Sequence, residues 1–243
     1  MGTSLCIDLG NTRKKCAVFE GDKIIDRIII EEESNLNEVI EKYRPQKSIL
    51  SSVINDTASL ELILSRHTQF HKLSFQTKLP FTTPVAKPET IGADRLALAA
   101  AAVTFHPGRN NLVIGLGSCI TYNFINKWNA FIGGSISPGM DMRFNALHTY
   151  TAKLPLVCAD WNFPMVGYDT RTNILSGVLL GISKEIDGIV NDYKEKYSNF
   201  NVLLTGGDGA NFARHLKSKI FADPDLIFKG LYAISEFNDD AKM

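Results

Sequence analysis

The sequence predicts an α/β protein built from two copies of one folding unit. The duplication is predicted by a repeated turn, because Cys6–Phe19 reads CIDLGNTRKKCAVF and Val113–Ile125 reads VIGLGSCITYNFI. In both stretches an apolar run ends in Leu-Gly followed by Asn or Ser, and a second apolar run follows. Each turn opens a group of three short strand-like runs, and helical patterns follow each group. Such self-similarity indicates an internal duplication.

The first half contains a three-stranded antiparallel meander followed by alternating helices and strands. Short runs rich in Ile, Val and Phe predict the strands, and an Ala- and Leu-rich stretch that ends at His106-Pro107-Gly108 predicts a strong helix. The predicted strands are Leu5–Leu9, Lys15–Phe19, Lys23–Ile30 and Lys47–Val53, and the predicted helices run from Ser34 to about Tyr43, from after Asp56, and over Ile91–Phe105.

The second half repeats this plan, so the sequence predicts two domains, residues 1–108 and 109–243. Asp169-Thr170 is expected to cap a long helix whose apolar residues recur at every fourth position from Ile174 to Val190. The predicted strands are Asn111–Leu116, Ile120–Asn126, Ala130–Ile136, Val202–Leu204 and Phe221–Ile227, and the other predicted helices run from Gly139 to about His148 and over Ala210–Leu216 and Gly230–Phe237.

Composition excludes several classes of partner. The chain has 243 residues, 44% of them hydrophobic, and its 26 basic and 26 acidic residues give no net charge. We therefore expect no nucleic-acid partner and no membrane partner. The N-terminus lacks the pattern of a signal peptide, and the four cysteines show no CxxC spacing. We expect a cytoplasmic protein with reduced thiols and no zinc site.

Glycine turns point to nucleotide binding. The two copies are expected to face each other across a cleft, with Gly10 and Gly117 in matching turns. A third glycine turn follows a predicted strand at Gly206-Gly207-Asp208. Such turns leave backbone N–H groups free to hold phosphate oxygens. One such turn is weak support, but the matched pair with a third favours a nucleotide site.

Asp8 ends a buried strand and is followed by small polar residues. We interpret Asp8 as the residue that holds a hydrated Mg²⁺, with Asn11 and Thr12 at the phosphate oxygens. Lys15 on the next strand is expected to neutralise a phosphate. The alternative is an ordinary Asn-containing turn beside solvated basic residues.

The stretch PETIGADR, Pro88–Arg95, is the second chemically informative motif. An acid in the first turn of a helix is common because it complements the helix dipole, and this is the alternative explanation of Asp94. Arg95 does not fit that explanation, because a base in the first turn is unfavourable. We interpret Asp94 as a proton acceptor and Arg95 as the group that holds an anion.

These motifs together resemble the type III pantothenate kinases of the acetate kinase, sugar kinase and actin superfamily. The resemblance covers nearly the whole chain, in the family's order. It implies two actin-like, ribonuclease H-like domains with mixed five-stranded sheets, flanking helices and a cleft between them. It also implies ATP-dependent phosphorylation of pantothenate, the first step of coenzyme A biosynthesis, by a homodimer that uses Mg²⁺ and K⁺ or NH₄⁺. The motifs are DLGNTRKK at 8–15, PETIGADR at 88–95, GGSISPGMDMRFNALHTYTAKLP at 133–155, DTRTNILSG at 169–177 and LLTGGD at 203–208.

The resemblance assigns roles by motif. Asp94 is expected to be the catalytic base. ATP is expected to contact two groups of residues: those of the phosphate loop, and Ser118, Gly206 and Gly207 in the second half. The substrate-binding residues are expected to be Gly92, Ala93, Asp94, Arg95 and Thr170, with Val85 beside them, and the phosphate loop is Asp8, Leu9, Gly10, Asn11, Thr12 and Lys15.

Three positions depart from the family pattern. Gly115 occupies the place of the aspartate that ligates the monovalent cation, and Asn123 replaces an acid on the next strand. Val85 stands where the family often has a tyrosine. A cation site without its charged ligand loses most of its attraction. We therefore expect an active kinase with weak or absent cation dependence.

Two alternatives stay open at this point. One is a catalytically impaired relative that binds ATP or pantothenate as a sensor or regulatory partner. The other is a kinase for a different small alcohol, which the Val85 departure raises. The family has also been named as an accessory factor for transcription, but the neutral charge argues against direct DNA contact.

Overall fold

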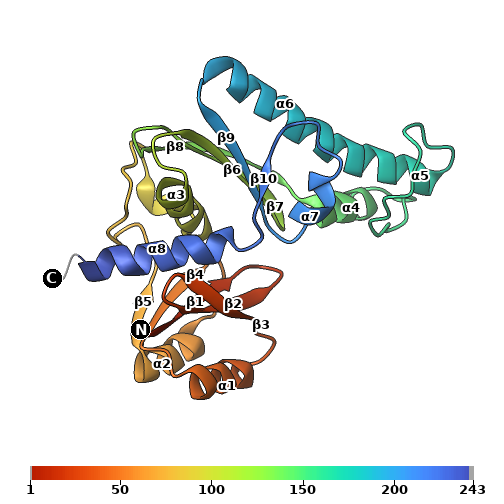
Figure 1. Ribbon diagram of the computed structural model, residues 1–243. Coiled ribbons are helices and arrows are strands. Elements are labelled where there is room, and N and C mark those ends of the chain that lie inside the picture. The colour runs from red at the N-terminus through yellow and green to blue at the C-terminus, as the bar shows by residue number, and fades with distance from the viewer. Residues whose placement is uncertain (1, 241–243) are drawn as a thin grey trace. The chain divides into compact units, whose positions relative to one another are not determined.

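The strands of the protein form two five-stranded sheets, in the orders β3-β2-β1-β4-β5 and β10-β9-β6-β7-β8 (Figure 1). The computed structural model describes residues 2–240. The chain packs as two compact units: the first takes the chain up to Gly108, Ile125–Gly133 and the chain from Asp225, and the second takes Arg109–Phe124 and Gly134–Pro224. The predicted domain boundary at 108/109 concerns the duplicated sequence and stays a prediction. In the folded chain, the later segments Ile125–Gly133 and Asp225 onward pack with the first unit.

The first sheet is mixed, as the resemblance implied. Strands β1, β2 and β3 form the predicted antiparallel meander, while β4 and β5 run parallel to β1. The elements of this unit are β1 (Thr3–Leu9), β2 (Lys14–Glu20), β3 (Lys23–Ile29), α1 (Glu33–Tyr43), β4 (Lys47–Ser52), α2 (Ala58–His67), β5 (Gln69–Lys72), the 3₁₀ turn η1 (Pro88–Thr90), α3 (Ala93–Phe105) and α8 (Leu226–Asp240).

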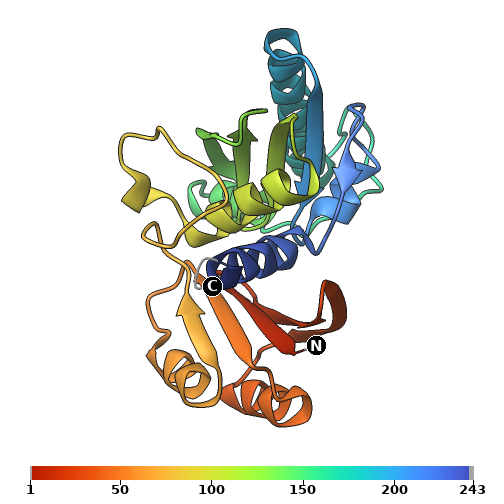
Figure 2. The ribbon, with the colours of Figure 1, turned by 60° about the vertical axis from the view of Figure 1, so that its left-hand side comes forward.

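Helices cover both faces of the first sheet. Figure 2 shows α1 and α2 on one face and α8 on the other. Alternate residues of β1 and β2 therefore enter two apolar layers: Leu5 and Val18 pack in the cluster with α1 and α2, whereas Phe19 stacks on Tyr232 of α8 with ring centroids 4.6 Å apart. Because β1 is central and covered on both faces, a polar side chain at its end is shielded from water.

The second sheet carries the other half of the chain. Its elements are β6 (Asn110–Leu116), β7 (Cys119–Ile125), β8 (Phe131–Pro138), α4 (Met140–Thr149), α5 (Thr170–Leu175), η2 (Ser176–Leu180), α6 (Gly181–Lys196), β9 (Phe200–Thr205), α7 (Gly209–Ala213) and β10 (Phe221–Ala222). Strands β6 and β9 pair in parallel, so their carboxyl ends meet at one edge of the sheet.

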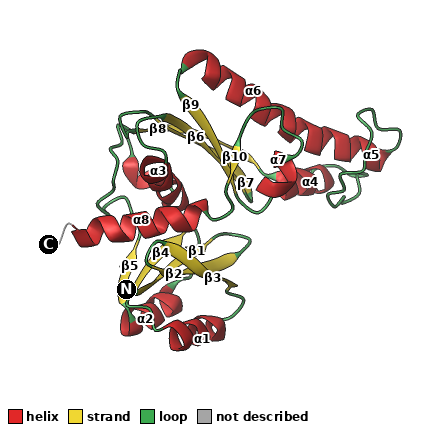
Figure 3. Ribbon diagram, in the orientation of Figure 1, coloured by secondary structure: helices red, strands yellow, loops and turns green. Residues whose placement is uncertain are grey.

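The predicted long helix is confirmed as a continuous run from α5 through η2 to α6 (Figure 3). The side chain of Asp169 caps it by accepting the N–H of Thr172 at 2.7 Å. The predicted apolar face from Ile174 to Val190 is buried against the second sheet. Segment η2 is a π-helix, a feature that the regular spacing of apolar residues did not reveal.

Two predictions near the C-terminus were wrong. The predicted strand Phe221–Ile227 is limited to β10, and α8 starts at Leu226 rather than at Gly230. The apolar residues Leu226, Leu231 and Ile234 are all buried at helical spacing, so packing of this stretch favours a helix. Strand β5 was not predicted. Among the described residues, no helix is long and apolar enough to cross a bilayer.

Gly230 of α8 supplies a stability test of the packing between α3 and α8. A Cβ at this position would lie 1.9 Å from the backbone oxygen of Ala97. Gly230→Ala is expected to lower the free energy of unfolding by roughly 1–3 kcal/mol, because neither helix backbone yields easily. The measurement is urea unfolding followed by circular dichroism.

The matched control is Gly181→Ala, also in a helix, where the added Cβ meets nothing within 4 Å. This change is expected to be neutral or to stabilise by up to about 1 kcal/mol, since alanine favours helix. Equal losses in both variants would contradict the proposed role of the close helix contact.

Candidate active site

Asp8 lies at the carboxyl-terminal end of β1, in the middle of the first sheet. Its neighbours in the sheet are Lys15 of β2 and Ser51 of β4. Because both faces of the sheet are covered, only 7% of the Asp8 surface is exposed. The Nζ atom of Lys15 is 3.5 Å from Oδ2 of Asp8 and also lies over the ring of Phe228. The structure therefore places a buried carboxylate beside one cation.

Burial controls the ionisation of Asp8. Desolvation raises the pKa of Asp8 from 3.8 to about 6, Lys15 opposes this rise, and the charge of Asp94 adds to it. Asp94 belongs to the same unit. The sequence alone did not establish that these two carboxylates belong to one compact unit.

The hydroxyl of Ser51 is a buried polar group beside Asp8. It is fully buried, stands opposite Asp8 in the β1–β4 pairing, and has no hydrogen-bond partner among residues 2–240. No cluster of three or more His, Cys, Asp or Glu side chains that could hold a metal ion occurs in the described part of the chain. An all-oxygen set with one or two carboxylates fits Mg²⁺, which keeps several waters and binds phosphates.

The turn after Asp8 is closed by a backbone hydrogen bond. The N–H of Gly10 donates to the carbonyl of Arg13 at 3.0 Å. Asn11 and Thr12 are exposed at the turn, whereas Leu9 is fully buried and its carbonyl accepts the N–H of Val53 at 3.1 Å. The turn therefore presents polar groups to solvent while Leu9 anchors it in the core.

Asp94 and Arg95 lie in the first turn of α3, directly after Gly92. The Asp94 carboxylate folds back over Gly92, where a Cβ would be 2.5 Å from its Oδ1. Burial raises the pKa of Asp94, and the backbone N–H and charge of Arg95 act against the rise. A carboxylate with a raised pKa in a half-buried position is suited to accept a proton.

The Arg95 side chain makes an aromatic contact. Its guanidinium lies over the ring of Phe131, 5.6 Å from the centroid. Burial lowers the pKa of Arg95, and Asp94 acts in the opposite direction, but a guanidinium stays protonated in proteins. Ala93 is buried beneath this turn, and Val85 is half-buried beside Gly133 of the same unit.

In the second unit, two glycine turns meet at the shared edge of β6 and β9. The carbonyl of Leu116 accepts the N–H of Asp208 at 3.3 Å, and a Cβ on Gly206 would lie 2.1 Å from the same oxygen. Gly206 has φ +100°, which other residues rarely adopt. Ser118 follows Leu116 in the first turn, and Gly207 is exposed in the second. The predicted residues Ser118, Gly206 and Gly207 are therefore brought together.

Of the other predicted positions in this unit, Gly115 lies directly before the first of these turns, whereas Thr170 and Asn123 lie in other elements. Thr170 is exposed at the first position of α5. Gly115 is opposite Thr205 in the β6–β9 pairing. The Asn123 side chain is fully buried and its amide donates to the carbonyl of Val113 at 3.2 Å. Asn123 therefore satisfies the backbone of a neighbouring strand.

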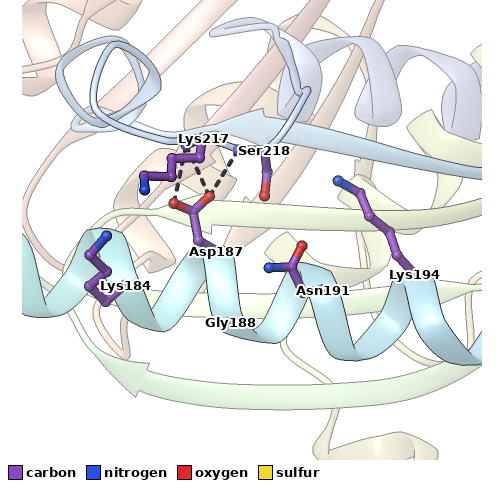
Figure 4. A pocket seen from close by; sticks show the side chains of 7 residues that line it. All are labelled: Lys184, Asp187, Gly188, Asn191, Lys194, Lys217 and Ser218. Carbon is purple, nitrogen blue, oxygen red and sulfur yellow. Dashed lines mark hydrogen bonds between the residues drawn. The ribbon is translucent and has the colours of Figure 1, made fainter.

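A pocket along α6 was not predicted (Figure 4). It has a volume of about 360 Å³. Both carboxylate oxygens of Asp187 accept backbone N–H groups of Lys217 and Ser218, at 3.0–3.1 Å. Although burial opposes it, these bonds lower the pKa of Asp187. The signal in the sequence is a polar stripe at helical spacing. The lining residues are Lys184, Asp187, Gly188, Asn191, Lys194, Lys217 and Ser218.

The fold is a duplicated actin-like fold. A Campylobacter jejuni protein named for the Baf family of transcriptional activators matches with TM-score 0.62 and 22% identity, covering 97% of this chain and 99% of that chain. MreB 5 of Spiroplasma citri, solved with AMPPNP, matches with TM-score 0.50 and 8% identity, covering 99% and 98%. At these identities the likeness shows the fold alone.

The sequence comparisons identify the family. The family model described as type III pantothenate kinase matches residues 4–192. The type III pantothenate kinase of Cytophaga hutchinsonii is 41% identical over 237 residues, which are 97% of this chain and 99% of that protein. That of Flavobacterium johnsoniae is 36% identical over 240 residues, 97% and 98% of the two chains. The chain belongs to the type III pantothenate kinase family.

Asp8→Asn is expected to stabilise the folded protein at neutral pH. The folded-state pKa of about 6 lies above the ordinary 3.8, so the folded protein binds this proton more tightly than the unfolded chain does. Stability therefore falls as the pH rises from about 4 to 6. For a shift of about two pKa units the cost reaches roughly 3 kcal/mol above pH 6. The uncharged variant does not bear this cost.

Urea unfolding at pH 4.5 and pH 7.5 measures the effect. The variant is expected to exceed the wild type at pH 7.5 and to approach it at pH 4.5. Asp22→Asn, at an exposed turn position, is the control and is expected to change stability by less than about 0.5 kcal/mol. An Asp8→Asn protein that is less stable than wild type at pH 7.5 would show that the ion pair with Lys15 outweighs desolvation.

Proposed function

We propose that this chain phosphorylates pantothenate with ATP, the first step of coenzyme A biosynthesis. The observation that carries the proposal is that a buried carboxylate at the end of β1, Asp8, and a half-buried carboxylate in the first turn of α3, Asp94, belong to one unit of a chain of this family. Phosphoryl transfer needs mainly positioning and charge neutralisation, with a carboxylate to receive the proton of the attacking hydroxyl. Asp8 is suited to the metal and phosphates, and Asp94 is suited to accept the proton.

Asp94 is the proposed base. As the primary hydroxyl oxygen of pantothenate forms its bond to the γ-phosphorus of ATP, the bond from that phosphorus to the β,γ-bridging oxygen breaks and ADP leaves. The Asp94 carboxylate takes the proton that the hydroxyl loses. The raised pKa of Asp94 makes it a stronger proton acceptor than an exposed aspartate. Arg95, fixed over Phe131, is proposed to bind an anionic group of the substrates, and Gly92, Ala93 and Thr170 to line the pantothenate site.

Asp8 is proposed to hold Mg²⁺ through bound water, with the nearby Ser51 hydroxyl as a further oxygen. A divalent cation held there would supply positive charge to offset the negative charge that develops on the phosphates during transfer. Gly10, Asn11 and Thr12 are proposed to contact the phosphates through turn N–H and polar side-chain groups, and Lys15 adds positive charge. Ser118 is also proposed to contact ATP, with Gly206 and Gly207 near the adenosine.

We propose that the protein is a cytoplasmic homodimer and has no nucleic-acid or membrane partner. Support for a second copy as partner comes from large apolar side chains that are exposed in the segment before α5. A soluble monomer rarely exposes several such residues together. They are Tyr150, Met165, Val166 and Tyr168, each at least 75% exposed.

No observation favours the alternative of a catalytically impaired sensor. The positions that depart from the family pattern leave the Asp8 and Asp94 carboxylates in place. Asn123 is part of the sheet's internal hydrogen bonding rather than an orphaned ligand. We propose that turnover in this protein does not need K⁺ or NH₄⁺, because Gly115 supplies no charge at the cation position.

The direct test is product formation from ATP, Mg²⁺ and pantothenate by the purified protein. Asp94→Asn is expected to lower kcat by about 10²–10⁴-fold, because the attacking hydroxyl loses its proton acceptor. Nucleotide binding, measured by calorimetry, is expected to be nearly unchanged. Glu89→Gln, an exposed acid on η1, is the matched control and keeps wild-type turnover. Full activity of Asp94→Asn would make the assignment of the base wrong.

Gly115→Asp tests the cation proposal. The restored carboxylate is expected to create stimulation by K⁺ that the wild type lacks, because a charged ligand returns to the site. Rates are compared in KCl and in a non-coordinating salt at equal ionic strength. An unchanged response to K⁺ would show that the turn at Gly115 is not equivalent to the family's cation turn.

A further inference from the structure

Arg143 of α4 ties three segments of the second unit together. Its Nε donates to the carbonyl of Pro138 at 2.9 Å, and its Nη2 donates to the hydroxyl of Ser137 at 3.0 Å. The same guanidinium forms an ion pair with Glu185 of α6. The planar fork of an arginine can satisfy these acceptors in fixed directions, which a lysine ammonium cannot. Arg143 therefore fixes the end of β8 relative to α6.

Glu185 is itself fixed from the sheet side. Its Oε1 accepts the hydroxyl of Tyr122, a side chain of β7 that is fully buried, at 3.0 Å. Burial and the Glu185 carboxylate raise the pKa of Tyr122, so the hydroxyl keeps its proton and remains a donor. The anchor for Arg143 is therefore a carboxylate that has donors on both sides and little freedom to move.

The segment that Arg143 holds lies directly against the turn after β6. Gly139 follows Pro138, and its N–H donates to the carbonyl of Ser118 at 3.1 Å. A Cβ on Gly139 would lie 2.2 Å from the carbonyl oxygen of Gly117 and 2.6 Å from that of Ser118. The backbone at Gly139 thus sets how far the turn at Gly117-Ser118 can move toward β8.

The fold of α4 does not itself require a cation at this position. The apolar side of α4 is supplied by Met140 and Phe144, which are buried in the core of the second unit. The contacts of Arg143 are made instead with the strand end and with α6. Its effect on the turn is therefore separable from its effect on the helix.

We propose that Arg143 is a positioning residue for nucleotide binding: through Ser137, Pro138 and Gly139 it fixes the turn at Gly117-Ser118. This inference rests on the proposed function, which places Ser118 against ATP. Loss of the guanidinium lets the strand end and the turn relax, so the N–H and hydroxyl groups of the turn lose their alignment. Binding of pantothenate, proposed for Asp94, Arg95 and their neighbours, does not depend on this contact.

The test measures Mg-ATP binding by calorimetry and both KM values by steady-state kinetics. Arg143→Ala is expected to raise the Kd and KM for ATP by about tenfold, in the range of one lost well-placed hydrogen bond to a charged group. The KM for pantothenate is expected to stay within about twofold, because that site is not touched. For Arg143→Lys, the Kd and KM for ATP are expected to lie between those of the wild type and those of Arg143→Ala. Lysine keeps the positive charge near Glu185 but lacks the planar fork of donors.

Arg27→Ala is the matched control. Arg27 forms a two-pronged ion pair with Asp225, both bonds 2.7 Å long, in the first unit. Its loss removes a comparable pair without touching the turn, so the ATP parameters are expected to stay at wild-type values. If Arg143→Ala does not fold, Ser137→Ala takes its place. This variant removes the hydroxyl that accepts one hydrogen bond from Arg143, and it changes no charge. An increase in the ATP Kd of about twofold to fivefold is expected for it.

Three outcomes would overturn the inference. One is an unchanged ATP Kd in the folded Arg143 variants, another is an equal rise of both KM values, and the third is a wild type that does not bind Mg-ATP. Failure of the proposed function is distinguishable. If wild-type protein binds Mg-ATP but phosphorylates no pantothenate, the assigned reaction is wrong, while the calorimetric comparison still decides the role of Arg143.

Discussion

The desolvation of Asp8 is the constraint on which the site depends. A carboxylate at the end of a central strand, covered by helices on both faces, has little contact with water and one nearby cation. Burial makes the charge costly for the folded protein, and it also strengthens every interaction the carboxylate makes with a bound cation. The charge of Asp94, in the first turn of α3, adds to this cost by raising the pKa of Asp8. Stability and chemistry are therefore opposed at this position.

The sequence predicted those features that are encoded locally. The turn after Asp8, the start of α3, the Asp169 cap and the apolar face of the long helix each depend on residues within a few positions of one another. Their chemistry is visible in the order of residues alone, because caps, turns and periodicity have short-range causes. The family motifs added the expectation that Asp8 and Asp94 act together.

Features that depend on tertiary contacts were missed. Arg143 forms an ion pair with Glu185, which lies 42 positions later in the chain, and no local pattern predicts that pairing. The orphaned hydroxyl of Ser51 becomes unusual only once β4 lies beside β1. The start of α8 was misplaced because Leu226 and Ile227 also fit a strand, and both are buried in the folded protein as the first residues of a helix. Such positions are chosen by packing, which sequence periodicity does not specify.

The first compact unit is discontinuous, and this has a consequence for synthesis of the chain. Its last helix, α8, begins at Leu226, although the sheet that it covers is complete by β5, at Lys72. A ribosome adding about 5–20 residues per second leaves one face of that sheet uncovered for roughly ten seconds or more. During that interval Phe19 has no Tyr232 of α8 to stack on. Apolar strand surface that stays exposed in this way is prone to aggregation until α8 has been made.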